Sequence, residues 1–150
     1  MKKWILVVFM FVVLTVTLSS QCFKDEKENV KHVILKAYVE GIKSLGDIEQ
    51  IKKGFHPDFT MLYNKKNNLN RLTLANWIKY VEKGKNKYPN GLKEKPVVKF
   101  HHIDITGNAA VVKFDLTQKG ITSTDYMFLL KFNEGWRIVS KIFHFHKKEK

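Results

Sequence analysis

The sequence has 150 residues, and its 27 Lys or Arg against 14 Asp or Glu give a formal net charge of +13. A strongly basic chain attracts anionic partners such as nucleic acid, membrane phosphates or an acidic ligand. The lysines are scattered and lack the interleaved arginine and aromatic residues of a nucleic-acid platform, so we expect no specific nucleic-acid binding. Cys22 is the single cysteine, which excludes an intramolecular disulfide and a zinc site made of several thiolates.

The beginning of the chain predicts export. Two lysines precede an apolar run over residues 4–18, and small or polar residues follow up to Cys22. This pattern is typical of a secretory signal peptide. A spanning helix needs about 20 apolar residues, so an uncleaved anchor is disfavoured. We therefore expect a signal peptide over residues 1–23, a single domain over residues 24–150, and a location in the periplasm or cell envelope.

Cys22 is also a candidate for lipidation, as the N-terminal residue of a bacterial lipoprotein. Two positions depart from the usual motif, because Ser19 stands where Leu is common and Gln21 where Gly or Ala is common. The Lys-Asp-Glu of residues 24–26 resembles the surface-export signal of some lipoproteins and equally suits a helix start. Ordinary cleavage near Cys22 and a lipid anchor therefore both stay open.

Helical periodicity follows the predicted signal peptide. Apolar residues recur at helical spacing over Val30–Leu45 and predict a first helix that ends at Gly46. Asp47 is placed to cap a short second helix with Phe55 on its inward side. Pro57 disfavours helical backbone at the residue before it and should stop this helix.

The pattern then changes to a hairpin and a third helix. Strands are predicted over Phe59–Tyr63 and Leu69–Leu72, joined by a turn rich in Asn and Lys. Thr73 is placed to cap the third helix, in which Trp77 lies on the apolar side. For Trp77, plain core packing and a position in the wall of a ligand pocket are both compatible with this placement.

Four consecutive strands complete the chain. Val97–Ile105 and Ala109–Thr117 are joined by a Gly-Asn turn, and a second hairpin covers Thr124–Phe145. Both faces of that hairpin are largely apolar, so we expect it to be covered on both sides. The predicted fold class is α+β: three N-terminal helices packed on a curved antiparallel sheet of about six strands.

Few residue patterns point to a reaction. The sequence has no glycine-rich phosphate loop and no nucleophile elbow. His144 and His146 share a strand face, but no third ligand is grouped with them, so we expect no metal site. Strand parity pairs Asp125 with Lys131 on one face and Lys141 with Arg137 on another. A structural salt bridge and a functional role both remain open for these groups.

Several stretches resemble a known family: GDIEQIKKGFHPDF (46–59), IDITGNAAVVKF (103–114) and TDYMFLLKFNEGWRIVSKIF (124–143). They are similar to the putative lumazine-binding family of the nuclear-transport-factor-2-like superfamily. The resemblance spans about residues 30–145 and implies a cone whose helices and concave sheet enclose an apolar pocket.

By that similarity, five residues are candidates for the polar and aromatic lining of the pocket: His56, Tyr63, Trp77, Asp125 and Lys141. The catalytic carboxylates of the isomerase branch of the superfamily have no matching motif here, so we assign no catalytic residue and no cofactor. The resemblance implies an exported domain that binds a small hydrophobic or heterocyclic ligand, and we expect a homodimer. The alternatives are an isomerase or dehydratase with His56 or Asp125 as base, and a structural or protein-interaction domain.

Overall fold

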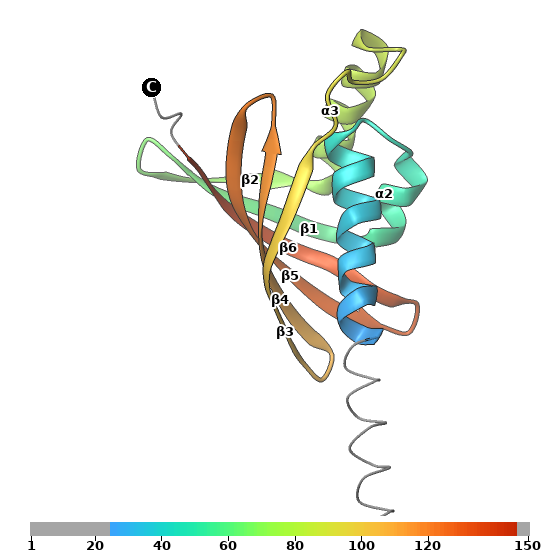
Figure 1. Ribbon diagram of the computed structural model, residues 1–150, viewed down its shortest axis with the longest axis vertical. Coiled ribbons are helices and arrows are strands. Elements are labelled where there is room, and N and C mark those ends of the chain that lie inside the picture. The colour runs from blue at the N-terminus through green and yellow to red at the C-terminus, as the bar shows by residue number, and fades with distance from the viewer. Residues whose placement is uncertain (1–24, 147–150) are drawn as a thin grey trace, which may run out of the picture.

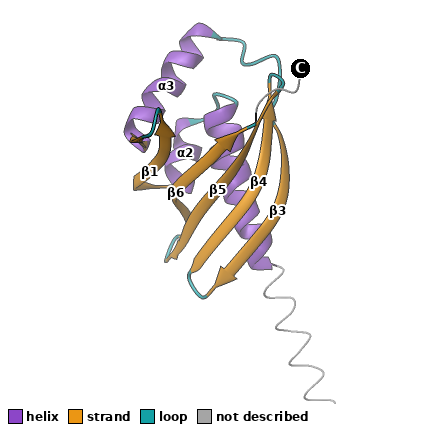
Figure 2. Ribbon diagram, turned by 90° about the vertical axis from the view of Figure 1, so that its left-hand side faces the viewer, coloured by secondary structure: helices purple, strands orange, loops and turns teal. Residues whose placement is uncertain are grey.

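The protein is described by a computed structural model that covers residues 25–146 (Figure 1). The predicted signal peptide and Cys22 lie outside this range. Six strands form one curved sheet, and the helices lie against one of its faces (Figures 1 and 2). The predicted α+β class and the six-stranded curved sheet are therefore confirmed.

Helices surround the concave side. The first helix runs from residue 25 and continues from residue 34 with the wider turn of a π-helix, η1 (Ile34–Lys43). It is followed by α2 (Ile48–Gly54) and, after two strands, by α3 (Leu74–Lys87). The position of α3 after two strands agrees with the hairpin predicted between the second and third helices. Thr73 does cap α3 as predicted, by accepting a hydrogen bond from the Asn76 N–H at 3.4 Å.

The end of α2 differs from the prediction. Phe55 was expected on the inward side of the helix, but it is extended, with φ −102° and ψ 144°, and opens the next strand. Pro57 disfavours helical backbone only at His56, whereas Phe55 is drawn out of the helix by its strand pairing with Ile138. Phe55 is nevertheless fully buried, so the inward direction was predicted correctly.

The sheet has the order β2-β1-β6-β5-β4-β3. Its strands are β1 (Phe55–Lys65), β2 (Asn68–Thr73), β3 (Val97–Thr106), β4 (Ala109–Gln118), β5 (Ile121–Phe132) and β6 (Gly135–Phe145). All neighbours are antiparallel except β1 and β6, which are parallel, so the prediction of a wholly antiparallel sheet is wrong at this pair. The turn glycines take positive φ, Gly107 at +58° and Gly135 at +111°, a backbone conformation that glycine adopts without strain.

A bulge in β6 changes which side chains face the core. Leu129 pairs with Ile138 and Phe128 pairs with Ser140, which leaves Val139 as an extra residue. Below the bulge Ile138 is buried, and above it Lys141 is buried, although simple alternation would put these two on opposite faces. The predicted pairing of Lys141 with Arg137 on one face is therefore wrong.

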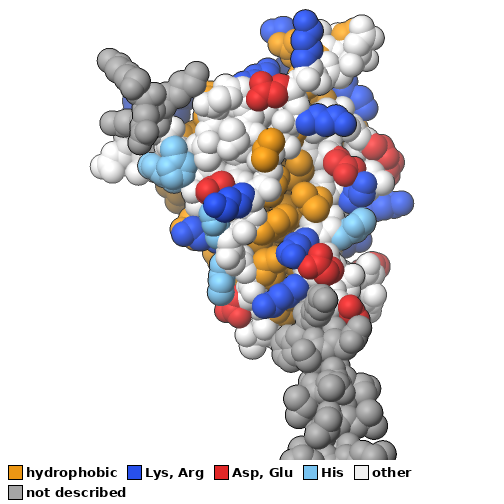
Figure 3. All heavy atoms as spheres, viewed as in Figure 1, with side chains coloured by type: hydrophobic (Ala, Val, Ile, Leu, Met, Phe, Trp, Pro, Cys, Tyr) orange, Lys and Arg blue, Asp and Glu red, His pale blue; other side chains and the backbone are white. Residues whose placement is uncertain are grey.

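The core lies between the helices and the concave face, whereas the outer face of β5 and β6 is open. Phe128, Leu130, Phe132 and Ile142 expose 41%, 38%, 37% and 43% of their surface. The hairpin is thus covered on one side, and within residues 25–146 the expected cover on its other side is not found. Lys and Arg side chains are spread over the face seen in Figure 3, as the sequence indicated.

Candidate functional site

Three polar side chains meet in the core. Asp125 and Tyr38 are fully buried and Lys141 is 3% exposed. The Lys141 Nζ lies 2.7 Å from Asp125 Oδ2, and the Tyr38 hydroxyl donates to the same oxygen at 2.6 Å. Lys141 Nζ also donates to the Tyr38 hydroxyl at 2.7 Å. We call these three residues the buried triad.

The sheet positions two members of the buried triad and the first helix supplies the third. Asp125 of β5 pairs with Phe143, and Lys141 of β6 pairs with Met127, so the two charged residues are diagonal neighbours on the concave face. Ser123 lies two residues before Asp125 on the same face and donates to its other oxygen at 3.0 Å. The carboxylate therefore has partners on both oxygens, which offsets the cost of its burial.

Burial changes the acidity of the triad. Loss of water contact, the largest effect, lowers the pKa of Lys141 from 10.5 to about 8, although the charge of Asp125 opposes this shift. Burial, followed by the negative charge of Asp125, raises the pKa of the Tyr38 hydroxyl well above 10.0. Lys43 lies over the Tyr38 ring at 5.6 Å, and burial lowers its pKa as well. A small fraction of Lys141 is therefore a neutral amine near neutral pH.

Aromatic rings surround the Lys141 ammonium. Nζ lies 4.7 Å from the centre of the Tyr38 ring, 4.8 Å from that of Phe143 and 5.7 Å from that of Trp77. Such contacts stabilise a cation by about 0.5–2 kcal/mol each. Trp77 stacks on Phe59 with 5.8 Å between ring centres and keeps part of its surface exposed. The triad thus lies under an aromatic layer that is itself in partial contact with solvent.

The structure brings together three of the five predicted lining residues, Trp77, Asp125 and Lys141. Tyr63 packs next to Phe143 on the outside of the aromatic layer, with 6.1 Å between the two ring centres. His56 is elsewhere: it stacks at 5.1 Å on Phe132, which lies on the outer face of the sheet, and its Nδ1 accepts from the Asp58 N–H.

Sequence reasoning missed Tyr38. It lies on the apolar side of the first helix, where a tyrosine commonly belongs to the core. The available signal was its hydroxyl group, because a buried tyrosine oxygen needs a hydrogen-bond partner and the core-facing strands offered Asp125. Lys131, in contrast, was predicted beside Asp125 and instead binds Glu26, with Nζ–Oε1 at 2.6 Å.

Two cavities lie away from the triad. One, of about 390 Å³, lies between the first helix, α2 and the β5–β6 turn, and includes Glu26, His32, Lys53, Lys131 and Trp136 in its wall. The other, of about 490 Å³, is formed by the segment after α3 together with Lys119. Neither has a triad residue in its wall, so the triad is covered in this conformation.

A second polar network lies on the outer side of the sheet. His101 Nε2 is 2.7 Å from Asp115 Oδ2, and Thr124 donates to the other Asp115 oxygen at 2.6 Å. Thr124 and His146 Nε2 are 2.8 Å apart. Within residues 25–146, no group of three or more His, Cys, Asp or Glu is arranged to hold a metal ion, and no helix is long and apolar enough to cross a membrane.

The curved sheet and the helices on its concave face give this chain a fold of the nuclear-transport-factor-2-like class. Within that class the chain belongs to the family described as "Putative lumazine-binding", whose sequence model matches residues 25–144. A domain of this family and fold is consistent with small-ligand binding.

Similar proteins support the fold and leave catalysis open. A nuclear-transport-factor-2-like protein from Shewanella baltica is 24% identical with a TM-score of 0.66, covering 84% of this chain and 98% of its own. One from Silicibacter pomeroyi is 16% identical with a TM-score of 0.67, covering 82% and 98%. A protein named aldolase FrzH, from Cladobotryum sp, is 29% identical over 112 residues, which are 71% of this chain and 82% of that protein.

Proposed function

We propose that this protein is an exported domain that binds a small heterocyclic ligand on its concave side, above the buried triad. The observation that carries the proposal is the convergence of Tyr38, Asp125 and Lys141 under a partly exposed aromatic layer. A carboxylate, a phenol and an amine offer both donors and acceptors, and the rings of Trp77 and Phe143 offer stacking surfaces. Planar heterocycles with ring nitrogens and carbonyl oxygens match this combination.

Energetics also favours a functional role for the triad. A buried ion pair loses two hydration shells, and replacing such a pair with apolar residues of similar volume is often neutral or stabilising. The Asp125–Lys141 pair is therefore expected to add little to the stability of the fold compared with apolar side chains of the same size. Because Trp77 and Phe143 cover Lys141, ligand entry requires these two side chains to move, and both are only partly buried.

The binding test uses the fluorescence of Trp77. With Trp4 and Trp136 replaced by Phe, Trp77 is the one remaining tryptophan, because the sequence has three. We expect lumazine and related heterocycles, titrated to millimolar concentration, to change its emission in a saturable way. Lys141→Met should weaken this binding, whereas Lys99→Met, a change of an exposed lysine on β3, should not. Unchanged emission for every heterocycle would overturn the proposal.

The second candidate function is acid–base catalysis of the isomerase, dehydratase or aldolase type. It is favoured by the lowered pKa of Lys141, about 8, beside the Asp125 carboxylate. A base or amine poised near neutral pH is suited to removing a proton next to a carbonyl group. His56 lies on the outer face, so Asp125 and Lys141 are the candidates for this chemistry. The similarity to a protein named as an aldolase is compatible with it.

Turnover separates the two candidates. Enolisable ketones and small aldol products are screened with the unmodified protein and with Asp125→Asn. Turnover that is lost in Asp125→Asn would establish the enzyme and end the binding-only proposal. If there is neither turnover nor heterocycle binding, the domain is structural or serves protein interaction.

We also propose that the domain forms a homodimer through the outer face of β5 and β6. Four large apolar residues, Phe128, Leu130, Phe132 and Ile142, are exposed together on two adjacent strands. Contiguous apolar surface of this kind marks an interface. A second copy is the occupant we propose, because a twofold axis can pair one such face with an identical face.

Export and lipid anchoring rest on the sequence before residue 25. Mass spectrometry of the N-terminus of the native protein tests both proposals. A start near Cys22 supports export, and a diacylated Cys22 supports an anchored lipoprotein. A start at Met1 in a cytoplasmic fraction would end the export proposal.

A further inference from the structure

The cavity near the start of the first helix contains a carboxylate held by two donors. Glu26 Oε1 accepts from Lys131 Nζ at 2.6 Å, and Oε2 accepts from the indole N–H of Trp136 at 2.6 Å. The two bonds come from β5 and β6 on either side of their turn, whereas Glu26 belongs to the first helix. Both donors therefore belong to the sheet, whereas the carboxylate that they bind belongs to the helix.

This pair of donors, which we call the receptor, is rigid on one side and open on the other. Trp136 is 5% exposed, so its indole N–H has a fixed direction. The side chains of Glu26 and Lys131 are 24% and 44% exposed, so both can move aside. The hydrogen bond from Lys131, which has the larger effect, and the one from Trp136 lower the pKa of Glu26, as expected for a carboxylate bound in its charged form.

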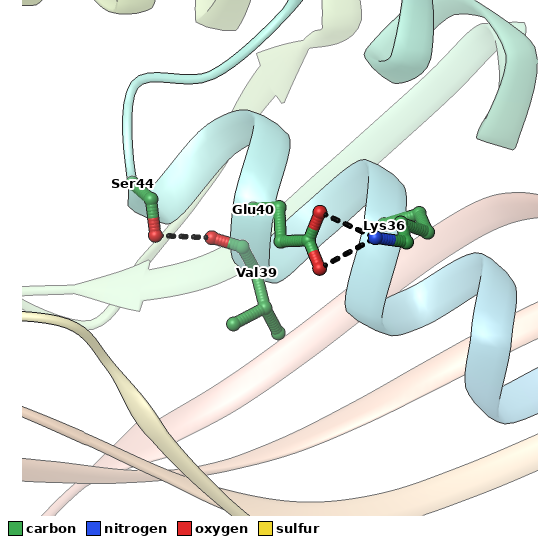
Figure 4. Close-up of polar contacts among 4 residues, drawn as sticks. All are labelled: Lys36, Val39, Glu40 and Ser44. Carbon is green, nitrogen blue, oxygen red and sulfur yellow. Dashed lines mark hydrogen bonds and ion pairs between the residues drawn. The ribbon is translucent and has the colours of Figure 1, made fainter.

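The remainder of the cavity wall contains basic groups, amide groups and one further carboxylate, Glu134. Lys36 is part of the wall, but Glu40 accepts from its Nζ with both oxygens at 2.9 Å (Figure 4). Lys53 and His32 face the same space and form no ion pair with any residue among 25–146. Asn29 and Gln50 contribute amide donors and acceptors. A volume of about 390 Å³ suits a small molecule and is too small for a folded partner.

We propose that this cavity binds a small carboxylate ligand, which displaces Glu26 from Lys131 and Trp136 and directs its second polar group to Lys53. Glu26 then acts as an internal competitor that occupies the receptor when the ligand is absent. The site is separate from the buried triad, so it gives the domain a second ligand of a different chemical class.

The test uses glutarate, a dicarboxylate that reproduces the side chain of Glu26, and glutaramide, its uncharged diamide. Trp136 is the reporter, in protein with Trp4 and Trp77 replaced by Phe and with the indole N–H followed by ¹⁵N NMR. We expect saturable binding of glutarate and none of glutaramide. Glu26→Gln weakens the competitor, so glutarate should bind about tenfold more tightly. Lys131→Met should abolish binding, and Lys99→Met should leave it unchanged.

Three results would overturn the proposal. The first is the absence of a glutarate response in both the unmodified protein and Glu26→Gln. The second is glutarate binding by Glu26→Gln and not by the unmodified protein, which would show that no ligand displaces Glu26 from Lys131 and Trp136. The third is equal binding by Lys131→Met. Each result is independent of heterocycle binding at Trp77, so this proposal and the proposed function fail separately.

Discussion

Tyr38 shows how one hydroxyl group holds a buried ion pair in place. Its oxygen donates to Asp125 and accepts from Lys141, so it satisfies both charges at once. Asp125 and Lys141 were both proposed from the sequence, on the resemblance to the family. Tyr38 did not stand out, since tyrosine on the apolar side of a helix is common and its partner is 87 residues away.

Removing that hydroxyl is the first prediction. Tyr38→Phe leaves Asp125 and Lys141 buried with one partner fewer, which should lower the free energy of unfolding by about 1–3 kcal/mol. Chemical denaturation measures the change. Tyr80→Phe is the matched control, because Tyr80 is 59% exposed and should change stability little. Equal effects of the two substitutions would contradict the role given to Tyr38.

The second prediction concerns pH. The folded pKa of Lys141 is about 8 and its unfolded value is near 10.5. Between these values the unfolded chain binds more protons than the folded one, so the lysine makes stability rise with pH. Well below pH 8 it is protonated in both states and contributes no pH dependence. Above about pH 10, Tyr38 has the opposite effect, because its folded pKa is raised.

Thermal unfolding at pH 7 and pH 9.5 checks this sign. The comparison is with the double variant Asp125→Asn, Lys141→Met, which removes both buried charges and keeps Lys43. The unmodified protein should gain more thermal stability over this interval than the double variant. An equal gain would show that the buried lysine does not titrate as described.

At the scale of elements, the bulge in β6 determines that Lys141 faces the core and so belongs to the buried triad. The strand from Trp136 to Phe143 looks regular in sequence, because Val139 is neither glycine nor proline and gives no signal of an extra residue. Alternation counted through it puts Lys141 on the wrong face. Strand positions and turn glycines were predictable because they depend on local residue preferences. The bulge was not, because it arises from pairing with β5 and β1.

The third prediction tests the bulge directly. Deleting Val139 removes the extra residue while keeping Ile138 and Lys141 inward, so the protein should still fold. Deleting Val111, in a regularly paired part of β4, reverses the facing of every residue on one side of the deletion and should abolish folding. Circular dichroism and thermal unfolding compare the two. Equal damage would argue against Val139 as the bulge residue.

At the scale of the whole molecule, one face of the sheet is covered by helices, and the other face exposes large apolar side chains. The sequence predicted this in part, since both faces of the β5–β6 hairpin carry large apolar residues. It could not show that residues 25–146 leave one of these faces open, because composition does not distinguish a core from an interface.

The fourth prediction is that the protein is dimeric and that Phe128→Gln with Leu130→Gln makes it monomeric. Both residues are exposed in the single chain, so the substitutions should leave its fold intact. Sedimentation equilibrium measures the mass. Leu69→Gln, at a residue 66% exposed on β2, is the control and should remain dimeric. A monomeric unmodified protein at high micromolar concentration would contradict the dimer.

The start of the first helix and the end of α3 lie at opposite ends of the molecule (Figure 1). A lipid anchor at Cys22 would therefore place the start of the first helix nearest the membrane and the end of α3 farthest from it. The lysines that follow α3 would then lie on the side of the domain that faces away from the membrane. The receptor occupied by Glu26, only four residues from the anchor, would open close to the lipid headgroups. Trimming by a signal peptidase would instead leave that receptor at a free chain end, so the maturation route would decide how readily Glu26 moves aside.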